Sequence, residues 1–154
     1  MLAYGACRYI DADGQELWIS KAGKWAPRIL KWGPDLIPQP GMLVRRAAWE
    51  QVGGLDESFK FAFDLDLLLK LQVIGGFVDV GQVVSSFRWH GDSLTVGDRS
   101  TSLAESERAR RMALSPGVRR AAWLWEGPVR VATRMAANEL HRRARTRLTA
   151  SATQ

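Results

Sequence analysis

Two aspartates at the start of a predicted helix are well placed for acid–base chemistry. Asp64 and Asp66 open an apolar segment with the spacing of a helix, which Gly75-Gly76 ends. An ionised carboxylate on a rigid element can take a proton from a hydroxyl group within hydrogen-bond reach. Asp64 therefore has two interpretations. It is a general base, or it is an N-cap that stabilises the helix by about 1 kcal/mol.

A second polar group closes a predicted strand in the segment Phe87-Arg88-Trp89-His90. Alternation along a strand places Arg88 and His90 on one face and Trp89 on the other. A guanidinium can pair with phosphate, and an imidazole can bind a metal. A lone histidine is more often a structural hydrogen-bonding residue, so both interpretations of His90 stay open.

The pattern Asp-x-Asp occurs twice. Where it ends a strand it can bind a divalent cation, because such hard ions prefer oxygen ligands. Asp11 and Asp13 follow a predicted strand, but Gly14 completes a turn signal, so a metal site and a turn are both possible. Asp64 and Asp66 precede a helix instead, and we reject them as a metal motif.

The elements that must position these residues have an α/β order. The patterns predict a strand over 2–10, a loop or short broken helix over 17–36, and helices over 45–52 and 64–74. They further predict strands over 77–80 and 83–89, separated at Gly81-Gln82. A helical segment follows over 102–148, with interruptions at Pro116-Gly117 and Gly127-Pro128.

Bulk properties indicate one modest core of ordinary composition. The chain has 154 residues, of which 46% are hydrophobic and 25% charged. It contains no apolar run long enough for a membrane-spanning helix and no signal-peptide pattern at its start. The single Cys7 excludes an internal disulfide and suits a reducing compartment. We expect a cytoplasmic location, with the inner face of the membrane as an alternative.

Positive charge is concentrated after residue 98. The net charge is +6, and the segment 99–154 carries more than this whole excess, because it has no lysine, only four glutamates and many arginines. Arginines interspersed with Trp123, Trp125 and apolar residues suit a membrane interface. The alternative is that the apolar side chains pack on the core while the arginines are solvated.

Four segments in a fixed order resemble one enzyme family. They are Gln39-Pro40, Gly53-Gly54-Leu55-Asp56, Phe63-Asp64-Leu65-Asp66-Leu67-Leu68-Leu69-Lys70 and Phe87-Arg88-Trp89-His90-Gly91-Asp92-Ser93. This set is similar to the acceptor-side half of the family-two, inverting glycosyltransferases of the GT-A fold. The resemblance implies an incomplete GT-A core over 1–98 followed by a basic helical tail over 99–154. One departure is Phe63, where the family usually has glutamate.

The resemblance implies a role for each candidate residue. Asp64 would be the general base when a sugar passes from a nucleotide-diphospho-sugar to an acceptor hydroxyl. Asp66 would support the helix start or the acceptor loop, and Gln39 would lie beside the acceptor. His90 would lie near the donor diphosphate and ligate a divalent metal, Mn²⁺ or Mg²⁺, with Arg88 as its neighbour. The implied partners are the nucleotide-sugar and a glycan or lipid-linked acceptor.

The resemblance also implies that the donor-binding half is missing. The family's segment matching Tyr4 to Gly14 normally forms a turn after the metal motif, which favours a turn at Asp11. We therefore expect a truncated or split transferase that is inactive alone and self-associates or needs a partner chain. The alternative is a non-catalytic remnant that binds an acceptor or lipid. We expect no nucleic-acid binding, because no zinc-finger, phosphate-loop or RNA-recognition motif occurs.

Overall fold

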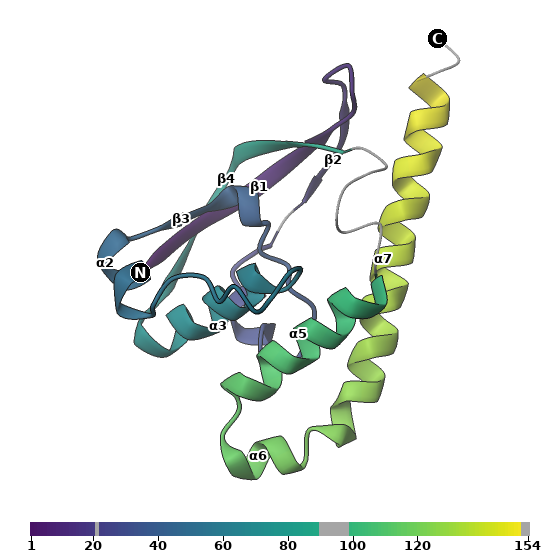
Figure 1. Cartoon of the computed structure of the whole chain (residues 1–154). Coiled ribbons are helices and arrows are strands. Elements are labelled where there is room, and N and C mark those ends of the chain that lie inside the picture. The colour runs from purple at the N-terminus through teal and green to yellow at the C-terminus, as the bar shows by residue number, and fades with distance from the viewer. Residues whose placement is uncertain (21, 90–98, 152–154) are drawn as a thin grey trace.

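The computed structural model describes residues 1–20, 22–89 and 99–151, and its sheet is organised around one long strand (Figure 1). This strand, β1 (Leu2–Ile10), pairs in parallel with β4 (Phe77–Arg88) along most of its length. β2 (Glu16–Ser20) and β3 (Met42–Val44) pair antiparallel with opposite halves of β1. They must therefore share its other edge end to end. The predicted α/β class is confirmed at this level.

The helices lie to one side of the sheet and along its flank. Figure 1 shows α3 (Phe63–Ile74) between the sheet and α5 (Arg99–Ala113), and α7 (Trp123–Ser151) running past the end of α5. The shorter elements are α1 (Ala26–Ile29), the 3₁₀ turn η1 (Gln39–Gly41), α2 (Arg46–Gln51) and α6 (Pro116–Arg120). α3 is thus the central layer of the described residues.

The position of α3 explains its composition. The buried residues of this helix are mostly leucines: Leu65, Leu67, Leu68, Leu69 and Leu71. A helix covered by a sheet on one side and a helix on the other can bury residues around most of its circumference. The predicted helix bounds differ from the observed ones by one residue at the start.

β4 is one strand with a bulge, which corrects the prediction of two strands. Its pairing with β1 shifts register between Tyr4 and Ala6, opposite Gly81 at φ +67°. Only glycine adopts that conformation without strain. β4 also approaches β1 closely at the bulge. A Cβ on Gly5 would lie only 2.6 Å from the carbonyl oxygen of Gln82. The glycine signal was real, but it marks a bulge and not the end of a strand.

Two further predictions of breaks or loops were wrong. We expected a loop where residues 16–20 form β2. The strand forms because pairing with β1 satisfies the backbone groups of these residues. α7 continues through Gly127-Pro128, so this proline costs the helix a backbone bond without ending it. The break near Pro116 is present, since α5 ends at Ala113 and Pro116 begins α6.

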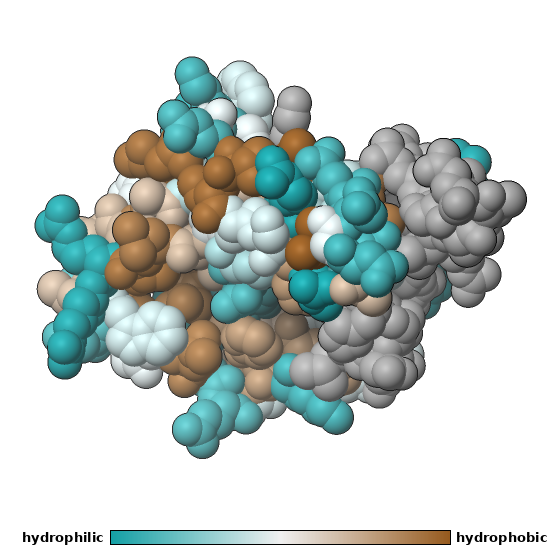
Figure 2. Space-filling view, turned by 90° about the horizontal axis from the view of Figure 1, so that it is seen from above, coloured by the Kyte–Doolittle hydropathy of each residue, from teal (hydrophilic) through white to brown (hydrophobic). Residues whose placement is uncertain are grey.

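One face of the sheet carries no covering helix or strand among the described residues. Figure 2 looks onto this side of the molecule and shows apolar side chains gathered over it. Leu43 is 75% exposed, Val78 61% and Val84 50%. Among the described residues no strand pairs with the outer edge of β4. An apolar face of this kind, beside an open edge, is typical of a surface that another polypeptide covers.

The start of α3 is stabilised by a carboxylate from another helix. The N-cap residue Ala62 has no side chain that could cap the helix. Glu105 of α5 accepts hydrogen bonds from the backbone N–H groups of Lys60 (3.1 Å), Phe61 (2.6 Å) and Ala62 (3.1 Å). Burial opposes ionisation of Glu105, but these donors and Arg108 outweigh it and hold its pKa below 4.5. The negative charge of Glu105 near the helix N-terminus also interacts favourably with the helix dipole.

We expect Glu105→Ala to lower the free energy of unfolding by about 2 kcal/mol, because backbone N–H groups lose a charged acceptor. Chemical denaturation at neutral pH measures this change. Because the pKa of Glu105 is lower in the folded state than in the unfolded state, its carboxylate stabilises the fold at pH values above the unfolded-state pKa. The loss of stability in Glu105→Ala should therefore shrink as the pH falls through 4.5 and below. Glu57→Ala, at an exposed glutamate near the same loop, serves as the control. Equal effects of the two substitutions would show that Glu105 contributes nothing special.

Candidate functional site

Asp64 lies in the first turn of α3, one residue beyond its start. Its Oδ1 accepts a hydrogen bond from the backbone N–H of Leu65 at 2.8 Å. The cap position belongs to Ala62, and Glu105 satisfies the N–H groups before the helix. The interpretation of Asp64 as the N-cap is therefore wrong, although its carboxylate does accept one first-turn N–H group.

The carboxyl of Asp64 is half-buried, and this environment makes it a stronger base than an exposed aspartate. Burial raises its pKa, and hydrogen bonds from the backbone N–H groups of Leu65 and of Asp64 itself oppose the rise only in part. A carboxylate with a raised pKa on a rigid helix meets the chemical requirement for proton abstraction.

A second carboxyl, which the sequence analysis missed, lies close enough to Asp64 to feel its charge. Asp35 precedes η1, and its Oδ1 accepts the backbone N–H of Ile37 at 2.9 Å. Burial raises the pKa of Asp35 to about 7, and the negative charge of Asp64 adds to the rise. The Ile37 N–H and Arg110 act in the opposite direction. Asp35 and Asp64 thus form an electrostatically coupled pair.

Arg110 of α5 is the cation beside this pair. Its Nε donates a hydrogen bond to the carbonyl oxygen of Leu30 at 3.2 Å, which fixes it against the segment that carries Asp35. Burial lowers the pKa of Arg110, while Asp35 and Glu107 raise it. A guanidinium remains charged in such surroundings. The site therefore combines two carboxyls and one cation from three separate parts of the chain.

Asp66 is turned into the interior. It is 3% exposed, and its Oδ2 lies 2.6 Å from Nζ of Lys70, one turn further along α3. The same oxygen has no partner with hydrogen-bond geometry, so the contact is an ion pair with a poor approach angle. An ammonium so close neutralises the charge of the carboxylate whatever its angle of approach. This ion pair accounts for the burial of Asp66, and its predicted supporting role stays a prediction.

Gln39 begins η1, which packs beside β1 and β4. Its backbone carbonyl accepts the N–H of Met42, and the residue is exposed. The position is four residues beyond Asp35, on the same segment. An exposed amide there is free to meet a ligand from solvent, and the predicted contact with an acceptor stays a prediction.

Arg88 is engaged at the other end of the sheet. Its Nη1 donates hydrogen bonds to the carbonyl oxygens of Asp11, at 3.0 Å, and of Ala12. The carboxylate of Asp11 in turn accepts the N–H groups of Asp13 at 3.0 Å and Gln15 at 2.8 Å. Asp11 is therefore a turn residue, as the resemblance favoured. The hydrogen bonds of Arg88 connect that turn to the end of β4.

The predicted metal ligand His90 lies outside the described residues, as does Ser93. Within the described ranges, no group of three or more His, Cys, Asp or Glu side chains could hold a metal ion. Asp11 already accepts two backbone N–H groups. The described residues therefore do not fit the divalent cation that the family resemblance implies, and that expectation stays a prediction.

The tryptophans of the segment 17–36 are engaged in different ways. Trp18 stacks on Tyr9 with ring centroids 4.4 Å apart, and it meets Trp89 edge-on at 5.3 Å. Trp32 meets Trp125 of α7 edge-on at 5.1 Å. Trp25 is exposed, with the guanidinium of Arg28 over its ring. Trp18 and Trp32 thus pack against other aromatic rings of the protein.

Comparison with known proteins adds no assignment. No protein-family model matches the chain, and no curated protein is significantly similar to it.

The coupling of Asp35 to Asp64 can be measured directly. In a carboxyl-carbon NMR titration, we expect Asp35 to titrate near pH 7. Asp64→Asn should lower that pKa, because it removes the negative charge that opposes ionisation of Asp35. Glu57→Gln, a substitution at an exposed carboxylate outside the pair, should leave it unchanged. An Asp35 pKa that stays the same in Asp64→Asn would show that the two carboxyls do not interact.

Proposed function

We propose that this chain supplies the acceptor side of an inverting glycosyl transfer, with Asp64 as the general base. One observation carries the proposal. The Asp64 carboxyl lies in the first turn of a buried helix whose cap position belongs to Ala62, it is half-buried, and burial raises its pKa. A carboxyl whose pKa is raised by partial burial is a candidate for function. The resemblance of the surrounding segments to glycosyltransferases is the reason for choosing this reaction.

The proposed step has a simple balance. The acceptor oxygen forms a bond to the anomeric carbon of the donor sugar, and the bond from that carbon to the nucleotide diphosphate breaks. The diphosphate leaves with the bonding electrons, and the hydroxyl proton passes to a carboxylate oxygen of Asp64. A positioned base of this kind contributes about 10²–10⁴-fold to a rate.

Asp35 is the carboxyl near Asp64 whose charge changes near neutral pH. Burial raises its pKa to about 7, and the negative charge of Asp64 adds to the rise. Arg110 limits this effect by favouring the ionised form of Asp35. The charge that Asp64 meets therefore changes near neutral pH.

The diphosphate must be neutralised by groups outside the described set. The family resemblance implies Mg²⁺ or Mn²⁺ for this purpose, and the described residues offer no ligand set for either. We assign no step to a metal. The described chain accounts for proton removal and leaves stabilisation of the leaving group to His90 and to a donor-binding partner.

A non-catalytic role as a partner-complementing module is the second candidate. The observation that favours it is the uncovered sheet face, where Leu43, Val78 and Val84 are exposed beside the open edge of β4 (Figure 2). Such a face fits a second polypeptide whether or not Asp64 performs chemistry. The two candidates differ in what a substitution of Asp64 does.

In an assembly of this chain with a nucleotide-sugar-binding region, we expect Asp64→Asn to lower sugar transfer about 10²–10⁴-fold. The amide is isosteric with the carboxylate but cannot take the acceptor proton. Donor affinity and the circular dichroism spectrum should not change. Glu57→Gln, at an exposed carboxylate of the preceding loop, serves as the control and should retain full activity. Retention of most activity in Asp64→Asn would exclude this residue as the base and favour the non-catalytic module.

We also expect the 154-residue chain alone to show no measurable transfer, because electrostatic positioning of the diphosphate supplies much of the rate. Calorimetric titration with nucleotide-sugars in the presence of Mn²⁺ or Mg²⁺, followed by a turnover assay, tests this expectation. Micromolar binding with turnover would place the donor site within the chain. Asp11 and Asp13 would then be its first candidates despite their turn contacts.

A further inference from the structure

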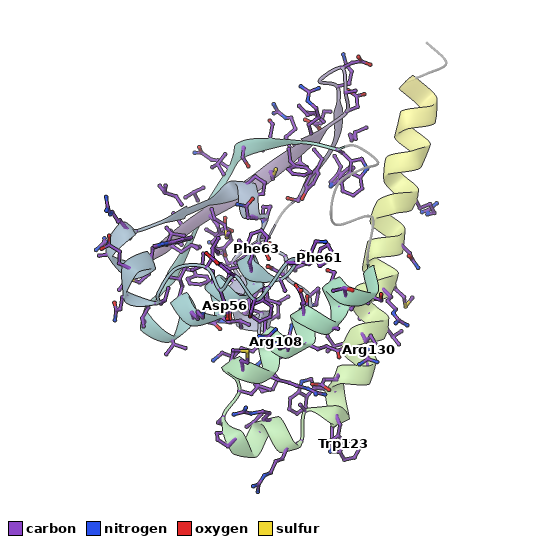
Figure 3. The ribbon with its side chains drawn as sticks, in the orientation of Figure 1. Asp56, Phe61, Phe63, Arg108, Trp123 and Arg130 are labelled. Atoms are coloured by element: carbon purple, nitrogen blue, oxygen red, sulfur yellow. The ribbon has the colours of Figure 1, made fainter. Side chains whose placement is uncertain are left out.

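The contacts of α7 with α5 and with Trp32, among the described residues, lie along one side of the helix. Arg130 pairs with Glu107 of α5 through two hydrogen bonds of 2.7 and 2.8 Å (Figure 3). Glu126 accepts two more from Arg111, one of them at 2.5 Å. The Trp32–Trp125 contact lies on the same side. These contacts define an inner side of the helix and leave the opposite side to solvent.

The opposite side carries large apolar residues that nothing in the described structure covers. Trp123 is 70% exposed, Leu124 59%, Val131 57% and Met135 66%. At about 100° of rotation per residue these four fall within roughly one third of the helix circumference. Figure 3 shows Trp123 pointing away from the body at the end of α7 next to α6. We name these four residues and Arg134, which shares their arc, the outer stripe.

The charge around the outer stripe is positive. Three glutamates of the segment 99–151 are used internally, since Glu105 caps the start of α3 while Glu107 and Glu126 bind arginines. Arg119 and Arg120 are exposed in α6 immediately before the stripe, and Arg134 is exposed within it. Among the described side chains of that arc there is no carboxylate. A ligand surface complementary to the outer stripe therefore offers apolar groups to its large apolar side chains and anionic groups to its arginines.

We infer that the outer stripe binds the surface of a bilayer that contains anionic phospholipid. Tryptophan favours the headgroup boundary, aliphatic side chains enter just below it, and arginines pair with lipid phosphates. Within the described residues no helix is long and apolar enough to cross a membrane, so the helix lies along the surface. A single convex helix with separated apolar residues matches a fluid, flat surface better than a packed protein interface. This inference does not depend on the proposed glycosyl transfer.

Vesicle co-sedimentation of the whole chain tests the inference. We expect binding to phosphatidylcholine vesicles that contain phosphatidylglycerol, little binding to phosphatidylcholine alone, and weaker binding at high salt. Leu124→Glu and Val131→Glu should each reduce the partition coefficient at least about tenfold, because each removes a buried aliphatic contact and adds a repelled charge. Replacing Arg119, Arg120 or Arg134 by glutamine should cost about fivefold per residue.

Matched controls come from exposed residues elsewhere. Trp25→Ala should leave binding unchanged, although Trp25 is 68% exposed and lies beside Arg28, whereas Trp123→Ala should weaken it. Leu43→Glu on the sheet is the control for Leu124→Glu. Circular dichroism checks that each variant keeps its helix content, and two separate glutamate positions prevent one misfolded variant from deciding the result.

Three results would overturn the inference. The first is equal binding to neutral and anionic vesicles, and the second is binding that survives both glutamate substitutions. The third is a chain that does not bind vesicles but forms dimers in sedimentation velocity that Leu124→Glu dissociates. That last result would make the outer stripe an interface between copies of the chain.

Discussion

The contact on which the described structure most depends is the one between Glu105 and the segment that enters α3. Glu105 accepts the N–H groups of Lys60, Phe61 and Ala62, of which the first is exposed and the other two are partly buried. Without that carboxylate the two partly buried donors would lose a charged acceptor, which costs about 1–3 kcal/mol.

Asp64 acts beside this contact, inside the first turn of α3. A helix usually obtains its first acceptor from its own cap residue, and here Ala62 cannot provide one. The Asp64 carboxyl instead accepts the N–H group of Leu65. Arg110, one turn further along α5, stands beside Asp35. α5 therefore supports the helix start with its anion and the carboxyl pair with its cation.

Local patterns predicted the regular elements better than the contacts between them. The strand over 2–10, the helix near Asp64 and the turn at Asp11 follow from alternation, apolar spacing and Asp-Gly chemistry, which act over a few residues. β2 and the unbroken α7 depend on distant partners, namely β1 for the strand and α5 with Trp32 for the helix. A single sequence contains no direct record of such partners.

The same limit explains the omissions at the site. Asp35 lies in a Pro-rich segment that predicts only an irregular loop, and nothing near it in sequence indicates that α3 will bring Asp64 alongside. Glu105 looked like one acidic residue in a basic helix. Both residues act across long separations in the chain, so their importance follows from the packing of α3 against α5. Asp64 itself was found because it opens a helix, which is a local property.

The described residues account for one part of the chemistry that we propose. A general base supplies about 10²–10⁴-fold, whereas enzymes that break stable bonds gain at least 10⁶-fold over the uncatalysed reaction. Most of the difference comes from charges placed where the leaving group develops its own. Arg110 is committed to Leu30 and Asp35, and Arg88 to the turn at Asp11, so neither is arranged for a diphosphate. The missing stabilisation must then come from residues that the described structure does not contain, or from a partner. The uncovered apolar face of the sheet is where such a partner would gain most by binding.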